Sequence, residues 1–192
     1  VVAGLAGLVF LLALGARFPP TAREAEITLT DDRPPLAAWL CGVALFLFLL
    51  GQASLQLWLP AWLEDRFGTD LATGAGAISR YWTGMAIGQA MLVVLLRFAP
   101  LRSWLLGTLL LSVFASGGVW LAADASTVAV AMLGLGLVNA GVLKLTIAGA
   151  AELVRHPQRV VSALLAASAL GTALGPFVSS ALVEASAPIH AL

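Results

Sequence analysis

The chain has 192 residues, of which 60% are hydrophobic and 10% are charged, and its mean hydropathy is +0.99. Soluble domains carry about a quarter charged residues, so this composition excludes an ordinary soluble protein. Ten basic residues balance ten acidic ones, so no excess of positive charge favours a nucleic-acid partner.

Six long apolar stretches predict six membrane-spanning helices, because an apolar run of about 18 residues crosses the hydrocarbon core of a bilayer. In chain order they cover residues 1–16, 36–63, 81–99, 103–123, 127–151 and 160–183. Segments of about 10 residues with alternating polarity, typical of a membrane barrel, are not seen. The first stretch is apolar from Val1, without an initiator Met or a basic lead-in. We therefore interpret it as a truncated span and not as a signal peptide.

The arginines are unevenly distributed among the connecting segments. Loops 17–35, 97–102 and 152–159 hold seven of them: Arg17, Arg23, Arg33, Arg97, Arg102, Arg155 and Arg159. Loops 64–80, 122–126 and 184–192 hold only Arg66 and Arg80. Cytoplasmic loops are enriched in Lys and Arg, so the first set of loops is predicted to be cytoplasmic.

Polar side chains inside membrane spans usually face a bundle interior or an aqueous cavity, because contact with lipid is costly. Six residues of this kind are our candidates for a substrate cavity: Gln52, Gln56, Tyr81, Gln89, Asn139 and Lys144. The spans 1–16, 103–123 and 160–183 hold no Asn, Gln or charged residue in their cores. This contrast separates the helices that line an aqueous path from those that face lipid.

Five of the six candidates also have a structural explanation. Lys144 either holds an anionic or hydroxyl-rich solute or extends its stem toward the cytoplasmic headgroups. Gln52 and Gln56, one helical turn apart, either contact a solute or hydrogen-bond between helices. Tyr81 and Gln89 either line a cavity or serve packing and interfacial anchoring.

No cofactor, metal or catalytic motif is apparent. The single cysteine, Cys41, lies inside a span, and the two histidines, His156 and His190, lie in separate loops. This arrangement does not resemble a metal-ligand cluster. The sequence also lacks a Gly-rich phosphate loop and a Ser/His/Asp grouping. We therefore expect neither an enzyme nor a bound cofactor.

Five segments carry a family resemblance: LGQ at 50–52, WLPAWL at 58–63, YWTGMAIG at 81–88, LLRF at 95–98 and ALGTALGP at 169–176. In this order and spacing they resemble the C-terminal half of a major facilitator superfamily transporter, nearest to its fucose-permease-like and TsgA-type bacterial branch. The resemblance implies an all-α membrane bundle that is partial, holding helices 6 to 11 of twelve. Residues 1–16 would end the N-terminal bundle, 17–35 would be the central cytoplasmic loop, and 36–192 would form five helices of the C-terminal bundle, without the last helix.

The resemblance also implies a function. It predicts a secondary active transporter that moves a small polar solute across the bacterial inner membrane by alternating access, with a proton or a sodium ion as the expected coupling partner. The N-terminal bundle would be its structural partner and would hold the acidic residue needed for proton coupling. Without it, the chain is not expected to transport. The alternative function is a non-transporting accessory or assembly protein of the membrane.

Some features of the resemblance fit the sequence and others depart from it. Helices 7 and 10 line the cavity in this family, which matches the positions of Gln52, Gln56, Asn139 and Lys144. However, the loop 97–102 lacks the acidic residue of the family's charged signature. Lys144 also matches no family motif, so its predicted role depends on the physical argument alone.

Overall fold

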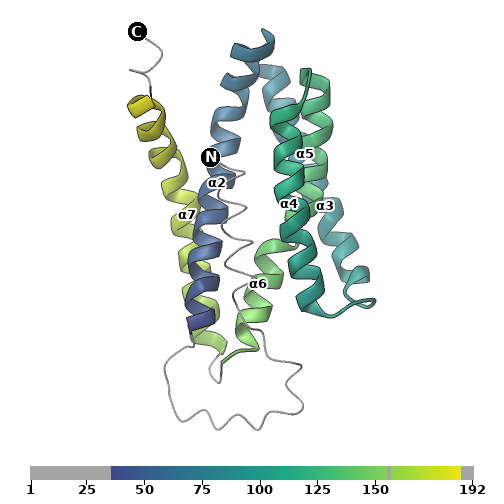
Figure 1. Cartoon of the computed structure of the whole chain (residues 1–192), viewed down its shortest axis with the longest axis vertical. Coiled ribbons are helices and arrows are strands. Elements are labelled where there is room, and N and C mark those ends of the chain that lie inside the picture. Colours follow the sequence, from purple (N-terminus) through teal and green to yellow (C-terminus); the bar gives the residue numbers. More distant parts are fainter. Residues whose placement is uncertain (1–35, 155–156, 187–192) are drawn as a thin grey trace.

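The computed structural model describes residues 36–154 and 157–186. The predicted helix 1–16, the loop 17–35 and the segment 187–192 lie outside the described residues. The described part consists of the helices α2 (Leu36–Phe67), α3 (Leu71–Leu95), α4 (Leu101–Leu121), α5 (Ala125–Asn139), α6 (Val142–Ala151) and α7 (Pro157–Ser186). These helices run alternately up and down one bundle, and α6 continues from α5 toward its lower end (Figure 1). The predicted all-α fold is confirmed.

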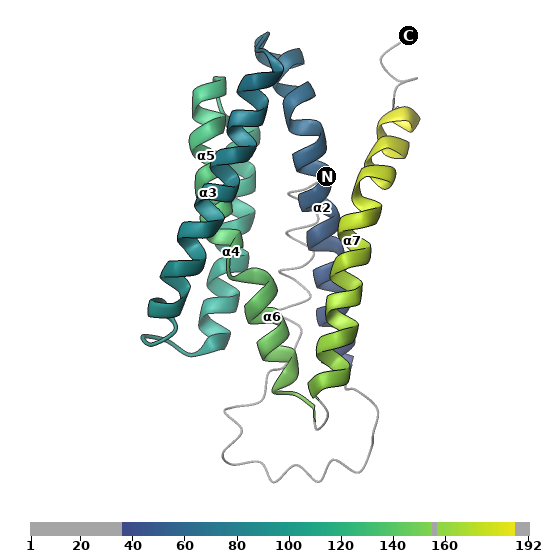
Figure 2. The same ribbon diagram turned by 180° about the vertical axis from the view of Figure 1, so that it is seen from behind.

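Within the described residues, four helical segments are long and apolar enough to cross a membrane: Leu36–Phe67, Leu101–Leu121, Ala125–Ala151 and Pro157–Glu184. The chain is therefore a multi-pass membrane protein. The sequence also predicted a span at residues 81–99, which overlaps α3; this helix is 25 residues long but does not belong to this apolar set. Arg80 and Gln89 interrupt the apolar sequence of α3, which lies in the same bundle as the other helices (Figure 2).

The connection between α2 and α3 is shorter than predicted. Helix α2 continues past residue 63 to Phe67, and α3 begins at Leu71 instead of residue 81. Most of the predicted loop 64–80 is therefore helical, and only residues 68–70 join the two helices. Arg80 consequently lies inside α3, about 13 Å along its axis from Leu71 at 1.5 Å per residue.

Two residues set this tight turn. Gly68 ends α2 with a φ of 64°, a left-handed conformation that glycine adopts without steric cost, and its N–H donates to the carbonyl of Glu64 at 2.9 Å. Asp70 begins α3 by accepting a hydrogen bond from the backbone N–H of Thr73 at 3.0 Å. The sequence prediction followed the apolar pattern and missed these two capping signals.

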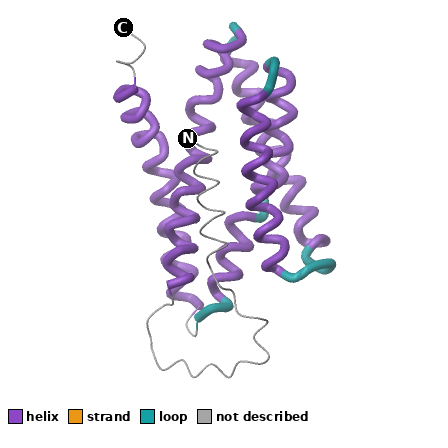
Figure 3. Tube along the Cα trace, in the orientation of Figure 1, coloured by secondary structure: helices purple, strands orange, loops and turns teal. Residues whose placement is uncertain are grey.

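The other helix boundaries differ less, except in the fifth predicted helix. Helix α3 ends at Leu95 instead of 99, α4 covers Leu101–Leu121 instead of 103–123, and α7 begins at Pro157 instead of 160 and ends at Ser186 instead of 183. The predicted helix 127–151 is interrupted at residues 140–141, which divide it into α5 and α6. The loops that join these elements are short (Figure 3).

Helices α3 and α5 pack closely through glycines. A Cβ atom added at Gly84 would overlap the carbonyl oxygen of Leu133, and one at Gly88 would overlap that of Leu137. From the other helix, a Cβ atom added at Gly136 of α5 would overlap the carbonyl oxygen of Tyr81. Small residues let two helix backbones approach, which is how helices commonly associate in membranes.

Helices α2 and α7 pack in the same way. A Cβ atom at Gly171 would overlap the carbonyl oxygen of Phe46, and one at Gly175 would lie 2.8 Å from that of Leu50. Ser54 of α2 adds a hydrogen bond to the carbonyl of Gly175 at 3.0 Å. The two helices lie side by side in both views of the bundle (Figures 1 and 2).

Helix α4 covers one side of the bundle and completes its core. Its residues Leu105 and Leu109 are buried against Leu92 of α3 and against Val142 and Leu145 of α6. With Ala44 and Phe48 of α2, this cluster joins four helices and holds α4 against the rest of the bundle.

Candidate substrate-contact site

Two of the six predicted residues meet inside the bundle. Tyr81 of α3 is completely buried, and Asn139, at the end of α5, is 6% exposed. The Asn139 side-chain nitrogen donates to the Tyr81 hydroxyl oxygen at 3.3 Å. Ser112 of α4, which is 2% exposed, donates to the Asn139 side-chain oxygen at 2.6 Å. One amide therefore connects three helices.

Gln52 and Gln56 are half-buried on α2. The Gln52 side-chain oxygen and the Gln56 side-chain nitrogen are buried, and neither has a hydrogen-bond partner in the part of the chain that the structure describes. An unpaired buried amide group costs about 1–3 kcal/mol, so such groups usually meet a ligand, a water molecule or another helix. The pair offers one acceptor and one donor, one helical turn apart.

The remaining candidates lie apart from these residues. Gln89 is half-buried on α3, and Lys144 is exposed on α6. The position of Lys144 on the short helix α6, below the break that follows α5, places it in the lower half of the bundle (Figure 1). The structure thus brings Tyr81 and Asn139 together but does not join all six candidates in one cluster.

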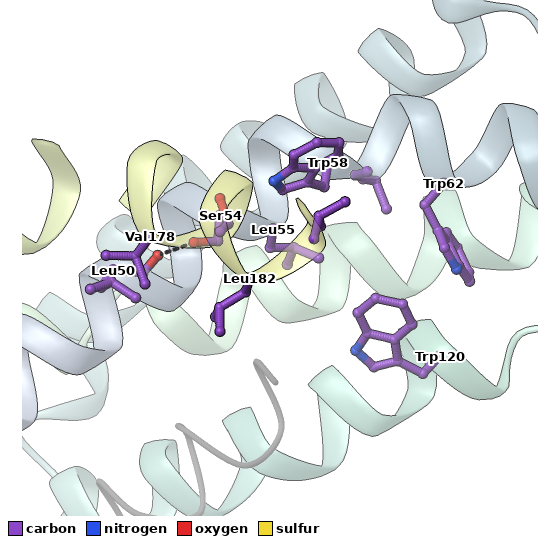
Figure 4. A pocket seen from close by; sticks show the side chains of 11 residues that line it. Leu50, Ser54, Leu55, Trp58, Trp62, Trp120, Val178 and Leu182 are labelled. Atoms are coloured by element: carbon purple, nitrogen blue, oxygen red, sulfur yellow. Dashed lines mark hydrogen bonds between the residues drawn. The ribbon is translucent and has the colours of Figure 1, made fainter. Parts of the chain in front are cut away.

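A cavity of about 250 Å³ lies between α2 and α7. Its lining is mainly apolar and includes three tryptophans, Trp58, Trp62 and Trp120, of which Trp62 and Trp120 lie at one end (Figure 4). The ring nitrogen of Trp58 is buried and has no hydrogen-bond partner among the described residues. Trp62 and Trp120 touch edge to face, with ring centroids 5.0 Å apart.

None of the six predicted residues lines this cavity. Gln52 and Gln56 are each two positions from Ser54, which does line it, and two positions correspond to a rotation of about 200° around a helix. The two amides therefore leave α2 on another side. The cavity and the amide pair are separate features of the same helix.

Sequence reasoning missed Ser112 and the cavity. It interpreted the span of α4 as lacking strongly polar residues, and a serine in a span gives little signal because it usually bonds to its own helix. Here the amide of Asn139 was the available signal, since a buried amide oxygen requires a donor on a neighbouring helix. The cavity depends on how far α2 and α7 diverge, which no local pattern encodes.

These features define a multi-pass membrane protein that is built as an all-α helical bundle. The chain is similar to proteins named TsgA homolog. It is 26% identical over 191 residues to that of Edwardsiella ictaluri (strain 93-146), which covers 95% of this chain and 47% of that protein. It is 26% identical over 196 residues to that of Yersinia enterocolitica, again with 95% and 47% covered.

A third TsgA homolog, from Serratia proteamaculans (strain 568), is 23% identical over 190 residues, with 95% of this chain and 47% of that protein covered. The chain thus spans about half the length of the curated relatives it matches. No family model matches the chain, and no solved structure matches it significantly. The similarity confirms the predicted resemblance to the TsgA-type branch.

Proposed function

We propose that this chain is part of a secondary active transporter that moves a small polar solute across the inner membrane by alternating access. The observation that carries the proposal is the pair of unpartnered buried amide atoms on Gln52 and Gln56. A hydrogen-bonding solute would satisfy both, since it can accept from one amide and donate to the other. Binding of a solute by these two amides requires no catalytic residue.

The bundle is oriented with the lower end of Figure 1 in the cytoplasm. Arg97, Arg102 and Arg159 lie at or near this end, in or beside the loops after α3 and α6, whereas Arg66 lies at the other end (Figure 1). This distribution supports the proposal through the enrichment of basic residues in cytoplasmic loops. We assign residues 36–192 to a C-terminal bundle that works against an N-terminal one, with residues 1–16 and 17–35 as its last helix and the central loop.

Uptake measurements test this function. Cells that produce the full-length carrier are assayed with a panel of labelled sugars, polyols and amino acids, and the carrier is expected to accumulate at least one of them. Replacing both Gln52 and Gln56 by Leu should reduce that uptake about tenfold or more, because two hydrogen bonds of roughly 1 kcal/mol each are lost. Membrane expression should be unchanged.

The matched control is Thr83→Val. Thr83 is an exposed residue whose hydroxyl donates to the carbonyl of Ser79 in its own helix, at 2.9 Å. This variant should transport normally. Normal uptake by the double glutamine variant would instead show that the amides serve packing.

The buried hydrogen bonds among Tyr81, Asn139 and Ser112 favour the second candidate function, an accessory or assembly protein. In such a protein the buried polar groups bond to one another, as these three do. The two functions differ at Gln52 and Gln56. An accessory protein would show no uptake of any solute in the panel, with or without the two glutamines.

A further inference from the structure

Arg80 is a charged residue at the level of the membrane core. The next residue, Tyr81, touches α5 through its backbone, because a Cβ atom added at Gly136 would overlap the Tyr81 carbonyl oxygen. Gly136 is the twelfth of the 27 residues of the apolar span Ala125–Ala151, so it lies near the middle of that span. Helix α3 gives a similar depth, since Arg80 is the tenth of its 25 residues. The sequence predicted Arg80 in the outer loop 64–80, whereas its backbone lies level with the hydrocarbon core.

The described part of the chain has no carboxyl group at this level. Its carboxylates all lie within about one turn of a helix end: Glu64, Asp65, Asp70, Asp124, Glu152 and Glu184. Arg80 has no ion-pair partner among the described residues. The other charged side chain inside the described spans is Lys144, in the span Ala125–Ala151, and it is also positive. The described interior of the bundle therefore carries only positive charge.

The face of α3 that carries Arg80 is open and lined by small residues. Ala77 and Tyr81 are completely buried, whereas the Arg80 side chain is exposed. Gly76 lies one turn above Arg80 and Thr83 one turn below it. A Cβ atom added at Gly76 would have no described neighbour within 4 Å, so there is free space beside the arginine. The Thr83 hydroxyl already donates to its own helix, which leaves the guanidinium as the available donor.

An unpaired arginine at this depth requires a partner. A charged side chain is costly against lipid hydrocarbon, and within membrane spans such residues face a protein interior or an aqueous cavity. The guanidinium group carries its N–H donors in a planar fork that matches the two oxygens of a carboxylate or phosphate group. Such hydrogen bonds are charge-assisted and strong. An oxyanion in the open space beside Gly76 would satisfy the Arg80 donors and neutralise its charge.

We propose that Arg80 binds an oxyanion of the transported solute, such as a carboxylate or a phosphate group. The inference depends on the carrier function proposed above and adds the class of substrate, which is a small organic anion. The positive charge of Lys144, in the lower half of the same bundle, favours the same class of solute.

Uptake of matched anionic and neutral solutes tests the proposal. The full-length carrier in proteoliposomes, with an inward proton or sodium gradient, is supplied with labelled glucuronate or glucose, glycerate or glycerol, and glycerol phosphate. We expect the carrier to accumulate at least one of the anions in preference to its neutral counterpart. Arg80→Gln should lower uptake of that anion about tenfold or more, because charge-assisted hydrogen bonds are lost. Arg80→Lys should fold normally and raise the KM for the anion, because lysine keeps the charge but not the planar fork.

The matched control is Arg66→Gln, which removes an exposed arginine in the last turn of α2 and should leave uptake unchanged. Accumulation of a neutral solute, with uptake that Arg80→Gln does not alter, would overturn the proposal and leave the carrier function standing. An equal loss of anionic and neutral uptake in Arg80→Gln would also overturn it, because Arg80 would then pair with a carboxylate of the protein. Uptake of none of these solutes, or of those in the wider panel, would contradict both the proposal and the carrier function.

Discussion

The side-chain nitrogen of Asn139 lies 3.3 Å from the hydroxyl oxygen of Tyr81, although the two residues are 58 positions apart. Both are almost completely buried, at 6% and 0% exposure. With Ser112 as the donor to its oxygen, Asn139 joins α3, α4 and α5 at the point where α5 ends. The contact therefore holds three helices in register next to the interruption before α6.

Asn139→Ala should lower the free energy of unfolding of the bundle by roughly 1 kcal/mol, because interhelical hydrogen bonds in membrane proteins contribute about 0.6 to 1.7 kcal/mol. Ser112→Ala should give a similar loss, and the double variant should lose less than the sum, since both changes remove one shared bond. Unfolding in mixed detergent micelles measures these values. Ser103→Ala, at an exposed position of α4, serves as the control. Strict additivity of the two losses would contradict the shared contact.

Gly84→Ala and Gly171→Ala should each destabilise the bundle, because the added methyl group meets a backbone carbonyl that cannot move aside. We expect a loss of about 1–3 kcal/mol for each, typical of overpacking. Gly107→Ala and Gly134→Ala are the controls, since no atom lies within 4 Å of the added Cβ at either position. Thermal unfolding in detergent compares the four variants. A stability of Gly84→Ala equal to that of the controls would be evidence against the close α3–α5 contact.

Two aspartates cap helices at the upper end of the bundle, and both have a lowered pKa. Hydrogen bonds from the side chain and then the backbone of Thr73 lower the pKa of Asp70. Those from the side chain of Ser126 and then the backbone of Thr127 lower the pKa of Asp124. The folded chain therefore favours the ionised carboxylates.

This shift predicts how stability depends on pH. A carboxyl group with a lowered folded pKa stabilises the protein above its unfolded pKa of about 3.9, and the contribution is lost as the pH falls through the folded value. Asp124→Ala should therefore lower the melting temperature at pH 7, and the difference from the unmodified chain should shrink below pH 4. Circular dichroism in detergent measures both. Asp65→Ala, at an exposed site within α2, is the control, and an Asp124→Ala effect that grows with acid would refute the assignment.

The sequence predicted the helical class and the approximate position of each described helix, except for the break that divides 127–151 into α5 and α6, because long apolar runs and prolines indicate membrane spans directly. The prediction failed where single capping residues set the helix ends, as Gly68 and Asp70 do in the turn between α2 and α3. Among the candidate residues, the partnership of Tyr81 with Asn139 depends on the approach of α3 to α5. That approach follows from glycine contacts whose partners are distant in the chain.

If the protein is a carrier, the side chain of Gln56 must face a water-accessible path that opens to each side of the membrane in turn. The test is the reaction of Gln56→Cys with a membrane-impermeant thiol reagent, in a Cys41→Ser background of the full-length carrier. Lys144→Cys and Ala77→Cys accompany it as an exposed position of α6 and a completely buried one of α3.

We predict that Gln56→Cys reacts when the reagent is added from either side, that Lys144→Cys reacts mainly from the cytoplasmic side, and that Ala77→Cys reacts from neither. Protection of Gln56→Cys from both sides, as complete as that of Ala77→Cys, would contradict alternating access at this site.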